Sequence, residues 1–133
     1  MPTIATRLRI DDWDEQPVAQ FDDGSRITRA TVRLTEGADG LTSGGFESVM
    51  YYRPDGTSDY VAVLHLLATL DGRSGSFAAA GRGAFDGTTA SGEYALVPDS
   101  MTGELDGLVG VCTSTSTEAD YPFMPLELRY DLP

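Results

Sequence analysis

Phenol groups are the reactive side chains that recur along this sequence. Tyr52, Tyr94 and Tyr130 each stand two positions from an apolar residue in a segment of alternating polarity, so each shares a strand face with that residue. A buried phenol in a filled interior bonds to backbone or water. In a hollow interior the same phenol can orient a ligand or act as a weak acid on a carbonyl. The apolar neighbours are Met50, Leu96 and Leu128.

Other catalytic groups are scarce in this chain. It holds one histidine, His65, and one cysteine, Cys112, so an intrachain disulfide is excluded and a zinc site of His and Cys ligands is nearly excluded. His65 stands among leucines in an apolar segment, which favours a buried or interface histidine over a catalytic base. Cys112 is interpreted as a small apolar core residue rather than a nucleophile. We therefore expect no metal and no cofactor.

Three polar segments resemble binding motifs only superficially. The acidic run Asp11–Glu15 (DDWDE) offers oxygen ligands for a hard cation but lacks the glycine and spacing of an EF-hand loop, so we favour a solvated loop. Gly81–Gly87 (GRGAFDG) has no lysine and does not open a helix, which argues against nucleotide binding. Thr113–Thr117 (TSTST) is interpreted as a polar loop or strand end.

The charge of the chain excludes several classes of partner. Its 133 residues include 21 acidic and 9 basic side chains, all of the latter arginine, for a formal net charge of −12. A nucleic-acid or anionic-membrane binder needs a basic surface, so we expect neither partner. The N-terminus lacks an apolar signal core, the apolar run Tyr60–Leu70 is too short to span a membrane, and the lone thiol fits a reducing compartment. These features predict a soluble, cytoplasmic protein of one domain, residues 1–133.

Tight turns divide the sequence into strand-like segments. Asp-Gly occurs six times, and the first four pairs recur every 16 residues. Both positions of Asp-Gly tolerate the positive φ angles of hairpin turns. The pairs begin at Asp23, Asp39, Asp55, Asp71, Asp86 and Asp106, and the predicted strands are 3–10, 27–35, 45–53, 59–70, 75–85, 89–97, 105–113 and 124–132. The predicted fold is all-β: an eight-stranded antiparallel up-and-down barrel.

The segment 59–70 is apolar on both of its faces. One face should look into the barrel, and the other carries Val61, Val63, His65 and Leu67. An apolar outer face needs cover from a loop, a terminal segment or a second subunit. Of these alternatives we slightly favour a homo-oligomer interface.

Short motifs spread over nearly the whole chain carry a family resemblance. The longest are Tyr52–Thr57 (YRPDGT) and Leu70–Phe77 (LDGRSGSF). The others are Trp13–Glu15 with Pro17, Thr28–Ala30, Phe85–Gly87, Val97-Pro98, Thr102–Leu105 with Gly107-Leu108, and Tyr130–Leu132. On these motifs the sequence resembles the bacterial family called domain of unknown function 3224, which is similar to the allene-oxide-cyclase-like (calycin-like) β-barrels. The resemblance implies a small, often oligomeric barrel without one established activity, within a superfamily that includes cyclases of flexible hydrophobic substrates.

Four positions depart from the pattern expected of that family. Leu64 stands in place of an expected Glu, Gly81 in place of an expected His, and Asp99 and Met101 each in place of an expected Gly. Loss of a Glu–His pair beside the small residues of Ala78–Gly81 predicts a larger and more apolar lumen. An empty apolar cavity costs about 24 cal/mol of stability per Å³, which suggests that a retained one has a use. The alternative is that a loop or Met101 refills the space.

Two functions from different classes fit these features. The first, which we favour on the resemblance to cyclases, is a cofactor-free cyclase or isomerase that folds a hydrophobic, polyene- or polyketide-like substrate in the lumen, with Tyr52 and Tyr94 polarising a carbonyl. The alternative is a barrel that binds or carries a small amphipathic ligand. A filled, purely structural barrel is the third hypothesis. The predicted substrate-binding residues are Trp13, Met50, Leu64, Leu66, Phe77, Ala79, Gly81, Phe85, Leu96, Leu128 and Tyr130.

Overall fold

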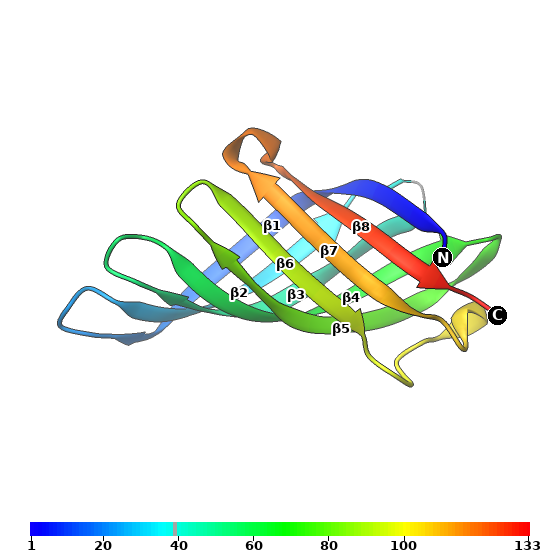
Figure 1. The fold of residues 1–133 in the computed structure, drawn as a ribbon, viewed down its shortest axis with the longest axis horizontal. Coiled ribbons are helices and arrows are strands. Elements are labelled where there is room, and N and C mark those ends of the chain that lie inside the picture. The colour runs from blue at the N-terminus through cyan, green and yellow to red at the C-terminus, as the bar shows by residue number, and fades with distance from the viewer. Residues whose placement is uncertain (39) are drawn as a thin grey trace.

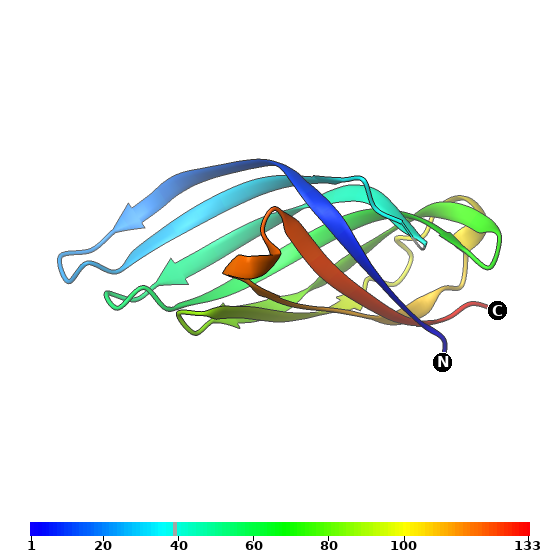
Figure 2. The same cartoon turned by 90° about the horizontal axis from the view of Figure 1, so that it is seen from above.

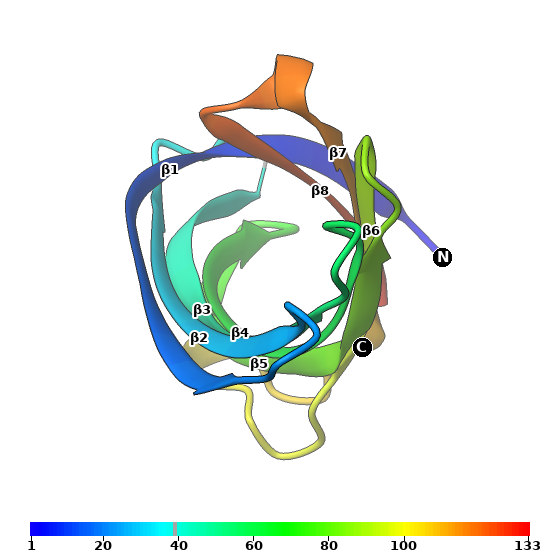
Figure 3. The same cartoon turned by 90° about the vertical axis from the view of Figure 1, so that its left-hand side faces the viewer.

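Eight antiparallel strands close into one ring in the computed structural model, which describes residues 1–38 and 40–133. Each strand pairs with the next along the chain, and β8 pairs back with β1, so the order around the closed barrel is the chain order (Figures 1 and 3). The strands are β1 (Thr3–Gln20), β2 (Arg26–Thr35), β3 (Leu41–Tyr52), β4 (Ser58–Leu70), β5 (Arg73–Phe85), β6 (Thr89–Leu96), β7 (Val109–Thr117) and β8 (Phe123–Asp131). The predicted all-β fold with up-and-down antiparallel order is confirmed.

The first strand is much longer than predicted. The prediction of a solvated loop at Asp11–Glu15 is wrong, because β1 runs through this segment to Gln20. β1 pairs with β8 over Thr3–Arg9 and with β2 over Arg9–Gln20, so its second half projects beyond β8 (Figure 2). The pairing with the alternating strand β2 outweighs the weak strand preference of aspartate.

A β-bulge in β1 decides which side chains of this extension face the lumen. Ile10 lies opposite Leu34, and Asp12 lies opposite Arg33, which is adjacent to Leu34. Asp11 is therefore an additional residue on β1. The shift places Trp13, rather than Asp12, opposite the buried Val32. An aromatic ring therefore reaches the inner side of the barrel wall from a segment dominated by carboxylates.

The seventh strand lies four residues further along the chain than predicted. β7 begins at Val109 instead of residue 105, because Leu105 belongs to the short 3-10 helix η1 (Gly103–Leu105). The segment Thr113–Thr117 is the end of β7 and pairs with the first half of β6. A second 3-10 helix, η2 (Glu118–Asp120), follows before β8.

Buried side chains fill the half of the barrel that holds the chain termini. Leu66, Phe77 and Leu128 are fully buried in one apolar core. The β6–β7 connection adds Leu105 and Leu108, which are also buried, and so closes this end of the lumen. Six of the predicted binding residues belong to the filled half: Leu66, Phe77, Ala79, Leu96, Leu128 and Tyr130.

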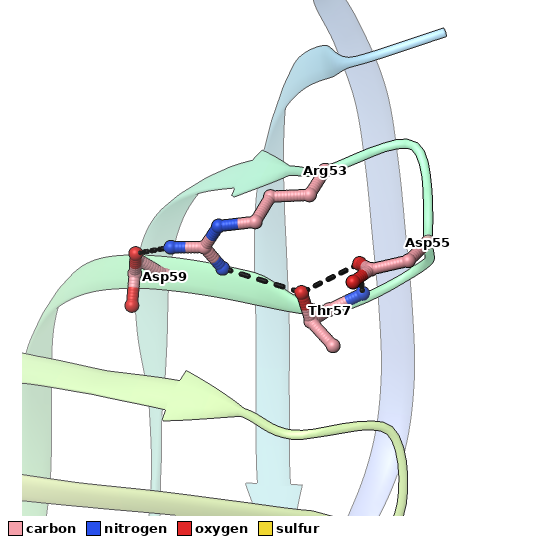
Figure 4. A network of polar contacts seen from close by, with 4 residues as sticks. All are labelled: Arg53, Asp55, Thr57 and Asp59. Atoms are coloured by element: carbon pink, nitrogen blue, oxygen red, sulfur yellow. Dashed lines mark hydrogen bonds and ion pairs between the residues drawn. The ribbon is translucent and has the colours of Figure 1, made fainter.

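Three hairpin turns at the opposite end of the barrel share the same chemistry. They are Asp23–Ser25, Asp55–Thr57 and Asp86–Thr88. In each turn the Asp Oδ1 accepts hydrogen bonds of 2.5–3.0 Å from the backbone N–H and the hydroxyl two residues further on. In the β3–β4 turn the threonine hydroxyl also accepts a bond from Arg53, which forms an ion pair with Asp59 (Figure 4). The Asp side chain thus holds each turn from within.

The positive φ angles predicted for Asp-Gly pairs occur at both residues in one turn. Asp71 has φ 53° and Gly72 has φ 76° between β4 and β5. In the three turns described above, the glycine alone takes a positive φ, because those connections are longer and the Asp side chain organises them. Of the predicted pair Asp39-Gly40, Asp39 falls outside the described residues, and Gly40 has φ 101°.

These turns predict a specific loss of stability in acid. Hydrogen bonds from the following Ser or Thr are the largest cause of lowered pKa values at Asp23, Asp55 and Asp86. A carboxylate whose pKa is lower in the folded than in the unfolded state adds stability above pH 4, and this is lost as the pH falls through the folded pKa. We expect Asp86→Asn to reduce the decline in denaturation midpoint between pH 5 and pH 2.5. An equal decline in Asp86→Asn and wild type would contradict this; Asp22→Asn is the charge-matched control.

The outer face of β4 stays exposed. Val61, Val63 and Leu67 are 56%, 54% and 43% exposed, and His65 lies exposed between them. The alternative of an intramolecular cover is not observed over these residues, and His65, interpreted as either buried or at an interface, is not buried within the described part of the chain. A second subunit on this face stays a prediction.

Candidate functional site

A cavity of about 320 Å³ occupies the half of the barrel nearest the hairpin turns. Its rim includes side chains that flank three successive turns, β3–β4, β5–β6 and β7–β8, and its inner end is formed by Ala62 and Leu64 of β4. The lining is mostly apolar. It comprises Ile10, Trp13, Phe46, Ser48, Met50, Tyr52, Ser58, Tyr60, Ala62, Leu64, Phe85, Ala90, Tyr94, Ser114, Ser116, Phe123 and Met124.

A pair of glycines in the wall makes room for two phenols. Gly83 of β5 lies opposite Gly92 of β6. A Cβ atom at Gly83 would lie 2.6 Å from the hydroxyl oxygen of Tyr60, and one at Gly92 would lie 2.2 Å from that of Tyr94. Both distances are shorter than van der Waals contact, so any larger residue would displace the phenols from this wall.

The two phenols form an interacting pair. Burial raises the pKa of Tyr94, and the neighbouring Tyr60 raises it further. Burial also raises the pKa of Tyr60, while the neighbouring Tyr94 lowers it in part. Both phenols therefore stay neutral at physiological pH. They can donate hydrogen bonds to a carbonyl oxygen of a ligand, but they do not supply a base.

Two serines that line the cavity direct their hydroxyls into the wall. Ser48 donates to the carbonyl oxygen of Val61 at 3.1 Å, and Ser114 donates to that of Pro125 at 2.6 Å. Among the described residues, every buried side-chain nitrogen or oxygen atom has a hydrogen-bond partner. The inner cavity therefore selects a ligand mainly by its apolar shape.

One carboxylate outside the cavity lining is hydrogen-bonded to residues of that lining. Glu15 Oε2 accepts hydrogen bonds from Thr28 at 2.9 Å and Tyr52 at 3.4 Å, and its Oε1 accepts one from the Trp13 indole at 2.9 Å. Arg26 lies over the Tyr52 ring, 4.3 Å from its centre. Burial and the adjacent Glu15 raise the pKa of Tyr52, and Arg26 opposes this rise. Trp13 and Tyr52, which both donate hydrogen bonds to Glu15, line the cavity itself.

The cavity brings together some of the predicted site residues and separates others. The predicted catalytic residues Tyr52 and Tyr94 line the same cavity with different partners, Glu15 for Tyr52 and Tyr60 for Tyr94. Met101 packs against the core of the filled half and is not part of the cavity lining. The predicted residues that line the cavity are Trp13, Met50, Tyr52, Leu64, Phe85 and Tyr94, whereas Leu66, Phe77, Ala79, Gly81, Leu96, Leu128 and Tyr130 lie outside its lining.

The glycine at position 81 fits its surroundings for a backbone reason. A Cβ atom at Gly81 would lie 1.9 Å from the backbone oxygen of Glu93. This backbone arrangement has no room for the histidine expected from the family resemblance. At Gly83 and Gly92 the space next to the backbone is occupied by the phenols of Tyr60 and Tyr94.

Sequence reasoning missed Tyr60, Glu15 and the lining serines. The alternation of β4 places Ser58, Tyr60 and Ala62 on the same face as Leu64, which was already a candidate. That signal was present in the sequence. Glu15 had no such signal, because its inward direction depends on the bulge at Asp11.

Cys112 gives a prediction that tests the burial of the lumen wall. Burial raises the pKa of this thiol to about 12. At pH 8 the thiolate fraction is then roughly one in ten thousand, against about one in ten in an unfolded chain. We expect iodoacetamide to react with native protein at least about a hundredfold more slowly than with urea-unfolded protein. Similar rates in the two states would contradict the buried position.

Residues 1–38 and 40–133 contain neither a metal-binding cluster nor a membrane-spanning helix. That part of the chain has no cluster of three or more His, Cys, Asp or Glu side chains able to hold a metal ion. It also has no helix long and apolar enough to cross a membrane. Neither finding adds a residue to the candidate site.

Comparisons with known proteins point to one family. Residues 4–130 match the model of a family described as "Protein of unknown function (DUF3224)". A search of curated proteins found no match. The chain is similar to a crystal structure of a protein with unknown function from that family, from Shewanella oneidensis MR-1, with a TM-score of 0.74 and 23% identity over 100% of this chain and 98% of that chain. At this identity the likeness shows a shared fold.

Proposed function

The chain belongs to the DUF3224 family of proteins of unknown function, and we propose that it binds a small, mostly apolar molecule inside its barrel. The observation that carries this proposal is the apolar cavity of about 320 Å³, closed at the end that holds the termini. Ligand pockets in proteins range from about 300 to 1,000 Å³ and combine apolar walls with a few polar groups. The cavity falls at the lower limit of that range, which suits a compact ligand.

Small residues in the cavity wall leave the cavity unfilled. An empty apolar space lowers stability, and larger side chains at the wall would remove it. Instead, the lining keeps the small residues Ala62 and Ala90, and Gly83 and Gly92 let the rings of Tyr60 and Tyr94 lie against the wall. The two phenols form the polar feature of an otherwise apolar interior, where they would receive a carbonyl or hydroxyl oxygen of the ligand.

A cofactor-free cyclisation or isomerisation is the second candidate function. One observation favours it: Tyr60 and Tyr94 are neutral, neighbouring phenols in a mostly apolar cavity, which is suited to polarising a carbonyl. The proposed kinship with allene-oxide-cyclase-like barrels fits this candidate, but fold alone does not determine activity. We place ligand binding first because both phenols are weaker acids than a free tyrosine.

Titration with N-phenyl-1-naphthylamine, a neutral apolar fluorophore, tests the proposed binding. We expect a saturable rise in fluorescence at one site per chain, reversed by small apolar competitors. A linear or absent response would contradict the proposal. For the second candidate, conversion of a bound compound to an isomer of equal mass should be lost in Tyr94→Phe and retained in Tyr121→Phe, an exposed tyrosine. Equal conversion by both variants would remove the phenol pair from the mechanism.

A cytoplasmic location and assembly into a homo-oligomer are further proposals taken from the sequence. The exposed valines of β4 support the second of these, because contiguous apolar surface often marks an interface. Sedimentation velocity of wild type and Val63→Glu distinguishes a homo-oligomer assembled through this face from a monomer. A slower-sedimenting variant supports assembly through this face, and a wild-type monomer contradicts it.

A further inference from the structure

Hydrogen bonds hold the Glu15 carboxylate in place, and it forms no ion pair with a described residue. Its hydrogen bonds come from the indole of Trp13 and the hydroxyls of Thr28 and Tyr52, which are all uncharged donors. Within the described residues, the side-chain ion pairs involve other carboxylates: Arg9–Glu36, Arg29–Glu47, Arg33–Asp11 and Arg53–Asp59. Glu15 therefore has no ion-pair partner among the described residues, although it is bonded to residues that line an apolar cavity.

Aromatic rings surround this carboxylate. Trp13 lies edge-to-face with Phe46, with ring centres 6.0 Å apart, and is still 44% exposed. Tyr52 already supports a cation on its ring, the guanidinium of Arg26. The exposed ring of Trp13 beside a carboxylate forms a suitable site for an ammonium group, through charge and cation–π attraction.

The electrostatic field of the whole molecule also favours a positively charged ligand. The formal net charge is −12, which raises the local concentration of cations and lowers that of anions. Arg26 is the opposing group at the rim, because its guanidinium attracts an anionic head group. It lies over the Tyr52 ring, whereas Glu15 bonds directly to two residues of the lining.

We infer that the ligand is an amine-bearing amphiphile, whose apolar part fills the lumen while its ammonium group contacts Glu15, Trp13 and Tyr52 at the rim. This inference rests on the proposed function, since it assigns the ligand class for the same cavity. A neutral molecule of equal size should bind more weakly, and a carboxylate more weakly still.

Three ligands with the same eight-carbon chain separate these cases: octylamine, 1-octanol and octanoate. Each displaces N-phenyl-1-naphthylamine from the protein near pH 7, where octylamine is cationic and octanoate anionic. We expect octylamine to bind about tenfold more tightly than 1-octanol, with octanoate the weakest. High salt should reduce the octylamine preference, because the rim is open to solvent.

Glu15→Gln tests the residue assignment with little change of shape. The ratio of octylamine to octanol affinity should fall from about ten to near one. Asp14→Asn removes the same charge from the neighbouring exposed position and should keep the wild-type ratio. Equal falls in both variants would show a general charge effect and overturn the role of Glu15.

The wild-type ranking tests the inference even if Glu15→Gln does not fold. Octanol binding as tightly as octylamine, or octanoate binding more tightly, would overturn the ammonium assignment and leave the binding cavity intact. Tighter binding of octanoate would mean that Arg26 holds an anionic head group at the rim. If neither the fluorophore nor any of the three ligands binds, the proposed function itself fails, and the ammonium assignment fails with it.

Discussion

Replacing Ala62 with phenylalanine is expected to weaken binding of the neutral fluorophore by at least about a hundredfold. Ala62 lines the cavity near its inner end and is 6% exposed. A phenyl ring at this position occupies the volume that the ligand needs. The same substitution should raise the free energy of unfolding by about 0.5–2 kcal/mol, because a filled cavity gains contacts. Fluorescence titration and urea denaturation measure the two effects.

Ala84→Phe is the matched control for this experiment. Ala84 is exposed on β5, and the substitution adds the same ring outside the lumen. Binding should stay at the wild-type level in Ala84→Phe. Unchanged binding in Ala62→Phe, with the protein folded, would mean that the fluorophore binds outside the barrel and would contradict the assigned site.

Truncation of Phe77 to alanine is expected to cost about 3–5 kcal/mol of stability. Phe77 is fully buried on β5, opposite Leu66, in the filled half of the barrel. Small domains have a total stability of about 5–15 kcal/mol, so this loss brings the variant close to unfolding at ordinary temperature. The melting temperature should fall by on the order of 10–20 °C. Calorimetry or thermal denaturation followed by circular dichroism measures the loss.

Phe85→Ala gives the matched comparison on the same strand. Phe85 is half-buried and borders the cavity, so fewer packed atoms depend on it. We expect a loss below about 2 kcal/mol for this variant. Similar losses at Phe77 and Phe85 would contradict the division of the barrel into a filled and a hollow half.

The fold could be predicted from the sequence because its signals are local. The alternation in β2 and β8 and the Asp-Gly turns predicted the strands and their order. The long first strand could not be predicted, since Asp11–Glu15 has weak strand preference and is held by its pairing with β2. The start of β7 was misplaced because Leu105 is apolar but is buried by η1.

Part of the candidate site could also be predicted, because the alternation of residues along a strand is a local signal. Alternation placed Met50 and Tyr52 on one face, and the same rule applied to β4 would have added Tyr60. Alternation does not distinguish the two halves of the lumen, so Phe77 and Leu128 were predicted as ligand contacts although they fill the core. The distinction comes from the β6–β7 connection, whose Leu105 and Leu108 are buried at one end of the barrel, and this is a feature of three-dimensional packing.

The most direct test of a ligand-binding lumen is mass spectrometry of what the protein retains. Wild type, Ala62→Phe and Ala84→Phe are each incubated with a lipophilic extract of the source organism, re-isolated and denatured. We expect a compound that is released by wild type and Ala84→Phe and is absent from Ala62→Phe. Release of the same compounds, or of none, by all three proteins would contradict it.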